Sequence, residues 1–261
     1  MTKDGARSLT LRIACGILMV GGCGGGGSDA HGQDAGAGGQ RSSEAGTGGT
    51  AGAAFVPQGC IVTKSAPVGG LIADFSPPDG GAPDASGSVG AIEVGGTVYA
   101  YGGSATPQYS FRGGALEIVE SASSTSATQY VGVGITFADC VDASAFRGVR
   151  FSIAGSVSGC AMNFTATISE DTYNDGTTNS DPQGACILGL LDCYSPLVDV
   201  TGLTSAPQTI SFAWPAFMYG MPDQTIDPAT ITGVAWSFAI AAGPSGTCAA
   251  DVSIDDVSFF E

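Results

Sequence analysis

Acidic side chains are the main groups in this sequence that could do acid–base chemistry. The only histidine, His31, lies in a glycine-rich stretch, so a Ser-His-Asp or Cys-His arrangement lacks a general base in the region predicted to fold. A carboxylate pair, as in glycoside hydrolysis, is the remaining route, and Glu117, Glu120, Glu170 and Asp171 are candidates because they lie near predicted strands. We interpret these four acids as solvated, and the sequence predicts no catalytic site.

The cysteines favour disulfide bonds over metal binding. Six follow Cys23 in the chain: Cys60, Cys140, Cys160, Cys186, Cys193 and Cys248. An even number in an exported chain is typical of disulfides, and zinc is improbable because there is no CxxC pair and no nearby histidine. Spacing alone does not choose the connectivity. We predict Cys186–Cys193, which closes a short loop, and Cys160–Cys248, which joins two predicted strand starts.

The N-terminus has the order of a secretory signal peptide. Basic residues precede a short apolar run, Ile13 to Val20, which is shorter than the roughly 20 residues that span a bilayer. The residues before Cys23 resemble the lipobox of bacterial lipoproteins. This resemblance implies that residues 1–22 are removed, that the Cys23 thiol is acylated and that the protein is anchored in the envelope, with Gly24 favouring the outer membrane. An ordinary signal peptide cut nearby is the alternative.

The next segment, residues 23–56, is predicted to be a disordered tether. It consists mainly of Gly, Ala, Ser and Thr, which cannot bury enough apolar surface to offset the entropy of ordering. Residues 1–22 hold three of the 8 basic residues and one of the 24 acidic residues, so the mature chain has a net charge of −18. This charge excludes nucleic acid as a partner and leaves the lipid anchor as the expected membrane attachment.

Residues 57–261 read as one all-β domain. Apolar and polar residues alternate with period two in several short stretches bounded by Gly, Pro, Ser and Asp, as in strands. These stretches are Ala115–Val119, Gly148–Ile153, Asn163–Ile168, Thr209–Phe212, Val234–Phe238 and Val252–Phe259. Helical periodicity is not convincing anywhere after the signal peptide, so we expect an antiparallel β-sandwich.

Four segments, in order, resemble the galactose-binding-like jelly rolls, and most closely the family 11 carbohydrate-binding modules and a related fold in a respiratory-complex assembly factor. They are Leu71–Phe75, Asp142–Phe151, Asp227–Trp236 and Ile254–Phe259. The first resembles the opening strand of these domains, the second and third resemble segments that enter central strands, and the fourth resembles the closing strand. The resemblance implies a jelly-roll sandwich whose function is to bind carbohydrate. Because one fold serves many functions, this implication is an analogy.

The same resemblance implies a structural calcium ion. In many such modules an ion joins the first strand to the last through an acid from each. Asp74 and Asp256 occupy the matching positions here, with Asp255 beside them. Calcium takes roughly six to eight oxygen ligands, so carbonyl groups or Asp79 would have to contribute. The alternative is that Asp255 and Asp256 face solvent.

Sugar binding requires aromatic faces and planar polar groups. Tyr173 and Tyr194 bracket the longest irregular connection, Ser169 to Pro196, which also contains Glu170 and Asp171. Connections of such length are usually functional or disordered, so we take these four side chains as candidate ligand contacts. Trp214, which ends a predicted strand, and Tyr219 are further candidates, whereas Trp236 alternates in phase with Val234 and Phe238 and is expected in the core.

The sequence therefore predicts a surface lipoprotein whose jelly-roll domain binds a polysaccharide or other glycan without catalysis. A structural or protein-interaction module of the cell envelope is the alternative. A glycosidase or lyase ranks below both.

Overall fold

A computed structural model describes residues 59–76, 92–102, 105–124, 127–174, 183–187, 193–243 and 246–261. The signal peptide, Cys23 and the tether lie outside these residues, as does Asp79, and the expectations attached to them stay predictions. Within the described residues, no helix is both long enough and apolar enough to cross a membrane.

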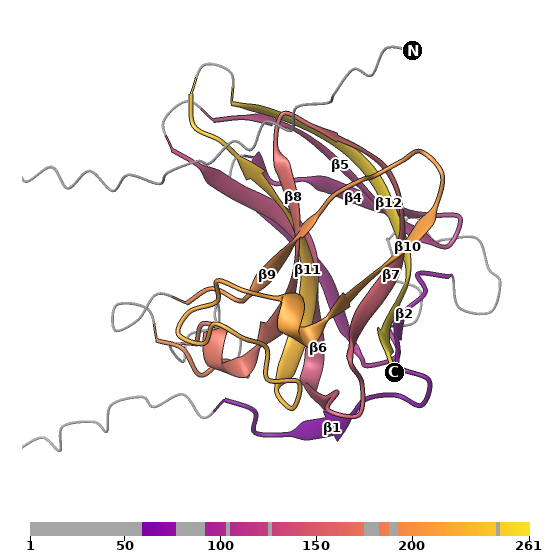
Figure 1. Ribbon diagram of the computed structural model, residues 1–261, viewed down its shortest axis with the longest axis vertical. Helices are drawn as coiled ribbons and strands as arrows, with labels where there is room; N and C mark the ends of the chain where they lie inside the picture. Colours follow the sequence, from indigo (N-terminus) through magenta and orange to yellow (C-terminus); the bar gives the residue numbers. More distant parts are fainter. Residues whose placement is uncertain are drawn as a thin grey trace, which may run out of the picture. The chain divides into compact units, whose positions relative to one another are not determined.

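The described residues form an all-β sandwich of two sheets, as predicted (Figure 1). The first, sheet A, has the order β1-β6-β11-β8-β9, and β3 pairs with β6 beside β1. Its strands are β1 (Thr63–Ser65), β3 (Gly96–Tyr101), β6 (Gln129–Asp142), β8 (Ala161–Ile168), β9 (Leu197–Val200) and β11 (Ile231–Ile240). All of its pairs are antiparallel except β1 with β6.

The second sheet, sheet B, has the order β10-β7-β12-β5-β4, and β2 pairs with the end of β12. Its strands are β2 (Leu71–Ala73), β4 (Gln108–Arg112), β5 (Ala115–Ser123), β7 (Gly148–Ser158), β10 (Gln208–Ala213) and β12 (Thr247–Phe260). The pairing of β2 with β12 joins the opening and closing strands that the four sequence segments indicated. Two 3-10 turns, η3 (Ser169–Asp171) and η4 (Trp214–Ala216), follow β8 and β10.

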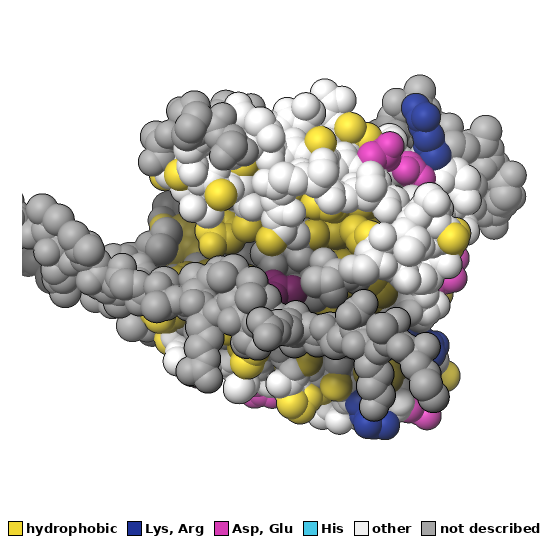
Figure 2. Space-filling model, turned by 45° about the horizontal axis from the view of Figure 1, so that its top comes forward, with side chains coloured by type: hydrophobic (Ala, Val, Ile, Leu, Met, Phe, Trp, Pro, Cys, Tyr) yellow, Lys and Arg dark blue, Asp and Glu magenta, His cyan; other side chains and the backbone are white. Residues whose placement is uncertain are grey.

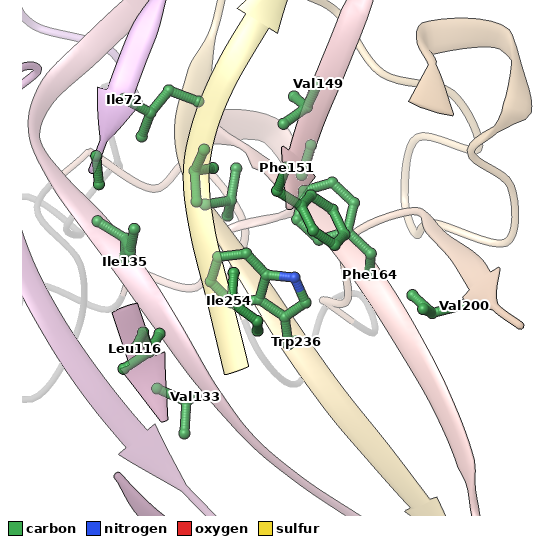
Figure 3. Close-up of a cluster of buried hydrophobic side chains, with 14 of the residues drawn as sticks. Ile72, Leu116, Val133, Ile135, Val149, Phe151, Phe164, Val200, Trp236 and Ile254 are labelled. Atoms are coloured by element: carbon green, nitrogen blue, oxygen red, sulfur yellow. The ribbon is translucent and has the colours of Figure 1, made fainter. Parts of the chain in front are cut away.

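The core lies between the inner faces of the two sheets. Phe151 of β7 lies 4.8 Å from Phe164 of β8, ring centroid to ring centroid, and 5.5 Å from Trp236 of β11 (Figure 3). All three side chains are fully buried. Trp236 is therefore a core residue, as the alternation predicted, because strand residues two apart face the same side of a sheet.

Each of the six alternating stretches lies within, or extends into, an observed strand. Alternation in the sequence did not identify β1, β3, β4, β6 or β9. The long strand β6 is buried on both faces over much of its length, and Gly132 and Gly134 replace polar residues on one of them. A strand covered on both faces loses the polar half of the alternation, so period two does not reveal it.

Candidate functional site

The outer face of sheet A brings tyrosines and polar side chains into one row across five strands. Residues paired in an antiparallel sheet point to the same side. The pairing register places Tyr101 of β3, Gly132 of β6, Ser237 of β11, Asn163 of β8 and Asp199 of β9 next to one another in that order. Their neighbours on the inner face, such as Trp236 and Phe164, belong to the core, so this row faces outward.

A second row runs parallel to the first, and the two tyrosines lie above glycines. Tyr99 pairs with Gly134 just as Tyr101 pairs with Gly132. A Cβ atom built on Gly132 would lie 2.6 Å from the Tyr101 hydroxyl oxygen, and one on Gly134 would lie 2.8 Å from the Tyr99 ring. The two ring centroids are 5.9 Å apart. Glycine is therefore required at both positions because the rings lie close over the backbone of β6. We call Tyr99, Tyr101, Ser237 and Asn163, with these two glycines, the tyrosine face.

The polar groups of the tyrosine face are held in place. Burial raises the pKa of the Tyr101 hydroxyl, and Tyr99 raises it further, whereas a hydrogen bond with Ser237 acts in the opposite direction. Ser237 and Asn163 are buried although they point away from the core. Asp199 is exposed on the edge strand β9. This set offers hydroxyl, amide and carboxylate groups beside two aromatic rings.

Figure 2 shows one face of the molecule, where hydrophobic side chains line a hollow and acidic side chains are scattered. The Lys and Arg side chains visible there lie toward its margin. Within the described residues, the basic side chains are all exposed and lie on β1, on sheet B or in the turn before β7: Lys64, Arg112, Arg147 and Arg150. Lys64 forms an ion pair of 2.5 Å with Asp139, and Arg150 donates to Ser258. The described basic side chains are therefore not part of the tyrosine face.

The predicted ligand contacts of the Ser169–Pro196 connection lie in a different place. Tyr173 is half-buried and forms a backbone bridge with Cys186. Tyr194, which is 48% exposed, pairs with Met221, three residues before β9 begins at Leu197. These tyrosines are outside the two rows of the tyrosine face. Residues 175–182 and 188–192 of the connection lie outside the described residues.

Trp214 is not an exposed platform, which corrects the expectation from its position at a strand end. It is only 8% exposed, and its indole N–H donates to the carbonyl of Phe146 at 2.9 Å. Its ring packs against Phe217 and Phe259. The η4 turn, which contains Pro215, directs the indole inward, and strand periodicity does not extend through such a turn. Tyr219, in contrast, is 69% exposed.

Asp171 and Glu170 hold loops together. Asp171 is 3% exposed, and one carboxylate oxygen accepts the amide of Asp223 at 2.9 Å. Burial raises its pKa to about 7, and the charges of Asp223 and Glu170 add to the rise, although the accepted hydrogen bond lowers it. Glu170 accepts the hydroxyl of Thr230 at 2.8 Å. The interpretation of Asp171 as a solvated acid is therefore wrong. It is also wrong for Glu120, which is 5% exposed.

The residues of the expected calcium site lie near one another at the junction of β2 and β12. Asp74 follows β2 and accepts the amide of Ser76 at 3.0 Å, and Asp255 accepts the amide of Asp256 at 2.7 Å. Burial raises the pKa of Asp255, and the charges of Asp256 and Asp74 contribute. No group of three or more Asp, Glu, His or Cys that could hold a metal occurs in the part of the chain that the structure describes. These side chains alone therefore do not supply the ligand number that calcium takes.

Three disulfides close the domain: Cys60–Cys140, Cys160–Cys248 and Cys186–Cys193. Cys160–Cys248 and Cys186–Cys193 are the two pairs that the sequence predicted. The first joins the segment before β1 to β6, and its partners are 80 residues apart in sequence. Three disulfides are typical of an exported protein.

Tyr99, Tyr101, Ser237 and Asn163 were missed as site residues at the sequence level. The signal for the tyrosines was present, because Thr97, Tyr99 and Tyr101 alternate with Val98 and Ala100. The glycines alternate in the same way along β6. Local alternation shows that such residues share a face, but it does not show that β3 lies beside β6.

No protein-family model matches this chain, and no curated protein matches it. Among solved structures it is similar to a family 11 carbohydrate-binding module from Clostridium thermocellum in complex with a β-1,3-1,4-mixed-linked tetrasaccharide, with 16% identity over 64% of this chain and 84% of that chain, at a TM-score of 0.39. It is also similar to the family 11 module of the cellulosomal cellulase Lic26A-Cel5E of the same organism. The two are 14% identical over 63% of this chain and 86% of that chain, at a TM-score of 0.39. An agarase, AgWH50C, is 11% identical over 74% of this chain and 26% of that chain, at a TM-score of 0.42.

Proposed function

We propose that this domain binds a polysaccharide chain, without catalysis, along the tyrosine face of sheet A. The observation behind the proposal is the placement of Tyr99 and Tyr101 over Gly132 and Gly134, beside the polar pair Ser237 and Asn163. A tyrosine ring lying along a sheet can stack on the apolar C–H face of a sugar ring. Hydroxyl and amide groups beside it can take the sugar hydroxyls, which fix orientation.

The test is a binding screen of the oxidised protein against a panel of soluble polysaccharides by affinity electrophoresis. Tyr99→Ala should weaken binding to the retained polysaccharide tenfold or more, because it removes stacking area from the site. Val119→Ala is the control, since Val119 lies on the outer face of sheet B, on β5, and is 51% exposed. Retention of no polysaccharide by the wild type, or equal loss in both variants, would contradict the proposal.

The loops beside β9 are proposed to extend this site. Tyr194 lies just before the edge strand β9, and its partner segment includes Tyr219. Tyr173 and Glu170 are retained only as contacts that the bridged loop could bring to a bound chain, whereas Asp171, at 3% exposed, joins the loops to one another. Tyr194→Ala and Tyr219→Ala should then lower affinity without changing the melting temperature, because both side chains are largely exposed. Unchanged affinity in both variants would confine binding to the tyrosine face.

A protein-interaction module of the envelope is the second candidate function. It is favoured by three exposed apolar side chains in the paired segments 194–197 and 218–221, namely Tyr194, Met218 and Tyr219, which are 48%, 51% and 69% exposed. Aromatic residues and Met are enriched at protein interfaces. The test is chemical cross-linking of the protein to other envelope proteins. If the Ala variants of these residues still bind polysaccharide but no longer form a cross-linked product, the second function applies to this surface.

The domain is further proposed to be attached to the bacterial envelope, at the outer membrane, through an acylated Cys23. Acyl chains supply the membrane affinity in such an anchor. Cys23→Ser should therefore move the protein from the membrane pellet to the soluble fraction. Sedimentation of the variant with membranes after a salt wash would contradict lipid anchoring.

A structural calcium ion at Asp74, Asp255 and Asp256 remains a proposal that needs backbone carbonyl ligands as well. A ligand bound only by the folded state stabilises it, by about 2.7 kcal/mol at a hundredfold excess over Kd. A chelator should thus lower the melting temperature of the wild type and leave that of Asp74→Asn unchanged. Identical melting curves of the wild type with calcium and with chelator would exclude the proposed calcium site.

A further inference from the structure

The outer face of sheet B carries an arginine near the end of β12. The pairing register places Arg150 of β7 between Ser211 of β10 and Ser258 of β12. Val149 and Phe151, the neighbours of Arg150 along β7, are fully buried in the core, so Arg150 faces outward. A basic side chain is uncommon in this chain, whose net charge is −16, and it therefore marks a place that attracts a negative group.

A pocket of about 370 Å³ opens beside Arg150. Gly148, which carries no side chain, pairs with Phe260 of β12, so no side chain of β7 fills the space beside that ring. Phe146, in the turn before β7, also lines the pocket and packs against the buried Phe259, with 5.6 Å between the ring centroids. Phe146 and Phe260 are both half-buried, so part of each side chain remains uncovered. The volume is within the range of about 300–1,000 Å³ that is usual for small-molecule sites.

A hydrogen bond holds the guanidinium group of Arg150 in position. Its Nε–H donates to the hydroxyl oxygen of Ser258 at 3.1 Å, and Ser258 is 6% exposed. This bond leaves the two terminal nitrogens, which have neither a hydrogen-bond partner nor an ion-pair partner among the described residues. A guanidinium group binds a carboxylate through two parallel N–H donors. Arg150 can therefore bind the carboxylate of a ligand in the pocket and keep its bond to Ser258.

The same pocket also has an acidic side chain in its wall. Glu261 lines it together with Arg150, yet no ion pair joins the two within the part of the chain that the structure describes. A ligand that is only an anion is repelled by Glu261, and a ligand that is only a cation is repelled by Arg150. A molecule that carries both charges satisfies both side chains at once.

We propose that this pocket binds a free α-amino acid with an aromatic side chain. The carboxylate of the ligand binds the terminal nitrogens of Arg150, its ammonium group binds the Glu261 carboxylate, and its ring packs against Phe146 and Phe260. Contacts between aromatic rings add to the gain from burial alone, so an aromatic side chain is favoured over an aliphatic one of similar size. The pocket is on sheet B and the tyrosine face is on sheet A, so the two sites do not depend on each other.

The probe is L-phenylalanine at neutral pH. The matched ligands are phenylpropionate, which lacks the ammonium group, and phenethylamine, which lacks the carboxylate. Titration of the full-length oxidised protein, followed by NMR of the backbone amides, measures binding directly. Phenylalanine should shift the amide signals of Gly69, Arg150 and Ser211, which line the pocket. It should bind at least about tenfold more tightly than either matched ligand, because each of these lacks one charged hydrogen-bonding group.

Variants of the two charged residues test which ligand group each of them binds. Arg150→Gln should weaken phenylalanine binding about tenfold or more and leave phenethylamine binding no weaker. Glu261→Gln should weaken phenylalanine binding by a similar factor and leave phenylpropionate binding no weaker. Arg147→Gln is the matched control, because Arg147 is an exposed arginine that does not line the pocket and its loss changes the net charge equally. Ser211→Phe should abolish binding of all three ligands, because a large side chain at this exposed position fills the pocket.

Equal affinity for phenylalanine and both matched ligands would overturn the proposal, and so would no binding up to the solubility limit. An equal loss of affinity in Arg147→Gln and Arg150→Gln would overturn it as well, because net charge alone would then explain the effect. If Arg150→Gln lowers the melting temperature, Glu261→Gln and Ser211→Phe still decide the outcome, since both residues are exposed. Polysaccharide binding at the tyrosine face is measured separately, so the two sites can fail independently.

Discussion

The two ends of the sandwich each contain a buried carboxyl group, and the two groups have different surroundings. Asp171 follows β8 at the end where β1 and the Cys60–Cys140 disulfide lie, and one of its oxygens accepts the amide of Asp223. Glu120 lies on β5, where it pairs with Ala250, two residues before Ala122, which pairs with Cys248 of the Cys160–Cys248 disulfide. Each keeps one carboxylate oxygen buried with no hydrogen-bond partner in the described residues.

The comparison shows that burial of an acid does not by itself indicate a site. Asp171 lies among loop segments that are joined by several hydrogen bonds, including Ser169 to Gln183 and Thr172 to Thr232. Its carboxylate is part of that scaffold, which joins η3 to the segment containing Asp223. Glu120 lies on the inner face of sheet B and pairs with Ala250, whose side chain can form no hydrogen bond with it. The surroundings of a buried acid therefore show whether its carboxylate takes part in the hydrogen-bond network of the fold.

The largest expected effect on the free energy of unfolding comes from removing the disulfide at either end of the sandwich. Replacing Cys160 and Cys248 together with Ala should lower the free energy of unfolding by about 4 kcal/mol, since the loop that the bond closes in the unfolded chain is long. The Cys60 and Cys140 double variant should lose a similar amount, because the sequence separations are 88 and 80 residues. Urea unfolding measures both. A much larger loss at the Asp171 end would show that its loop network depends on the disulfide.

Asp171→Asn should stabilise the protein by about 4 kcal/mol at pH 8, since the pKa rises by about three units and each unit corresponds to about 1.4 kcal/mol. The folded state retains its proton up to about pH 7, whereas the unfolded carboxyl ionises near 3.8. The stability of the wild type should therefore fall as the pH rises from 3.8 to about 7 and be level above that range. Asparagine keeps the acceptor for Asp223 and removes the titration. A gain of the same size at pH 3 and pH 8 would show that the charge is not responsible.

The smallest effect, and the one that separates the two ends most sharply, comes from apolar replacements. Glu120→Leu should raise the free energy of unfolding by about 1 kcal/mol, because it removes an unpartnered polar group from an apolar layer. Asp171→Leu should lower it by about 1 kcal/mol or more, because the amide of Asp223 loses its acceptor. Thermal unfolding at pH 7 measures both. Changes of the same sign would mean that the two acids have equivalent surroundings.

Local pattern in the sequence determined much of the fold. Alternation in stretches such as Gly148–Ile153 and Val252–Phe259 predicted strands and their inward faces, and it placed Trp236 in the core. Cysteines at strand starts indicated the Cys160–Cys248 pair. These features depend on residues a few positions apart, because the period of a strand is set by the backbone itself.

Only the tertiary structure decided which of those faces meet. Tyr101 and Asn163 are 62 residues apart in the sequence, yet they share one row of sheet A because β6 and β11 lie between β3 and β8. Trp214 turned inward at a 3-10 turn, and Glu120 came to be buried on the inner face of sheet B. Strand order and the filling of the space between sheets are non-local properties. They are decided when all of the strands pack together, and no single stretch of the chain contains that information.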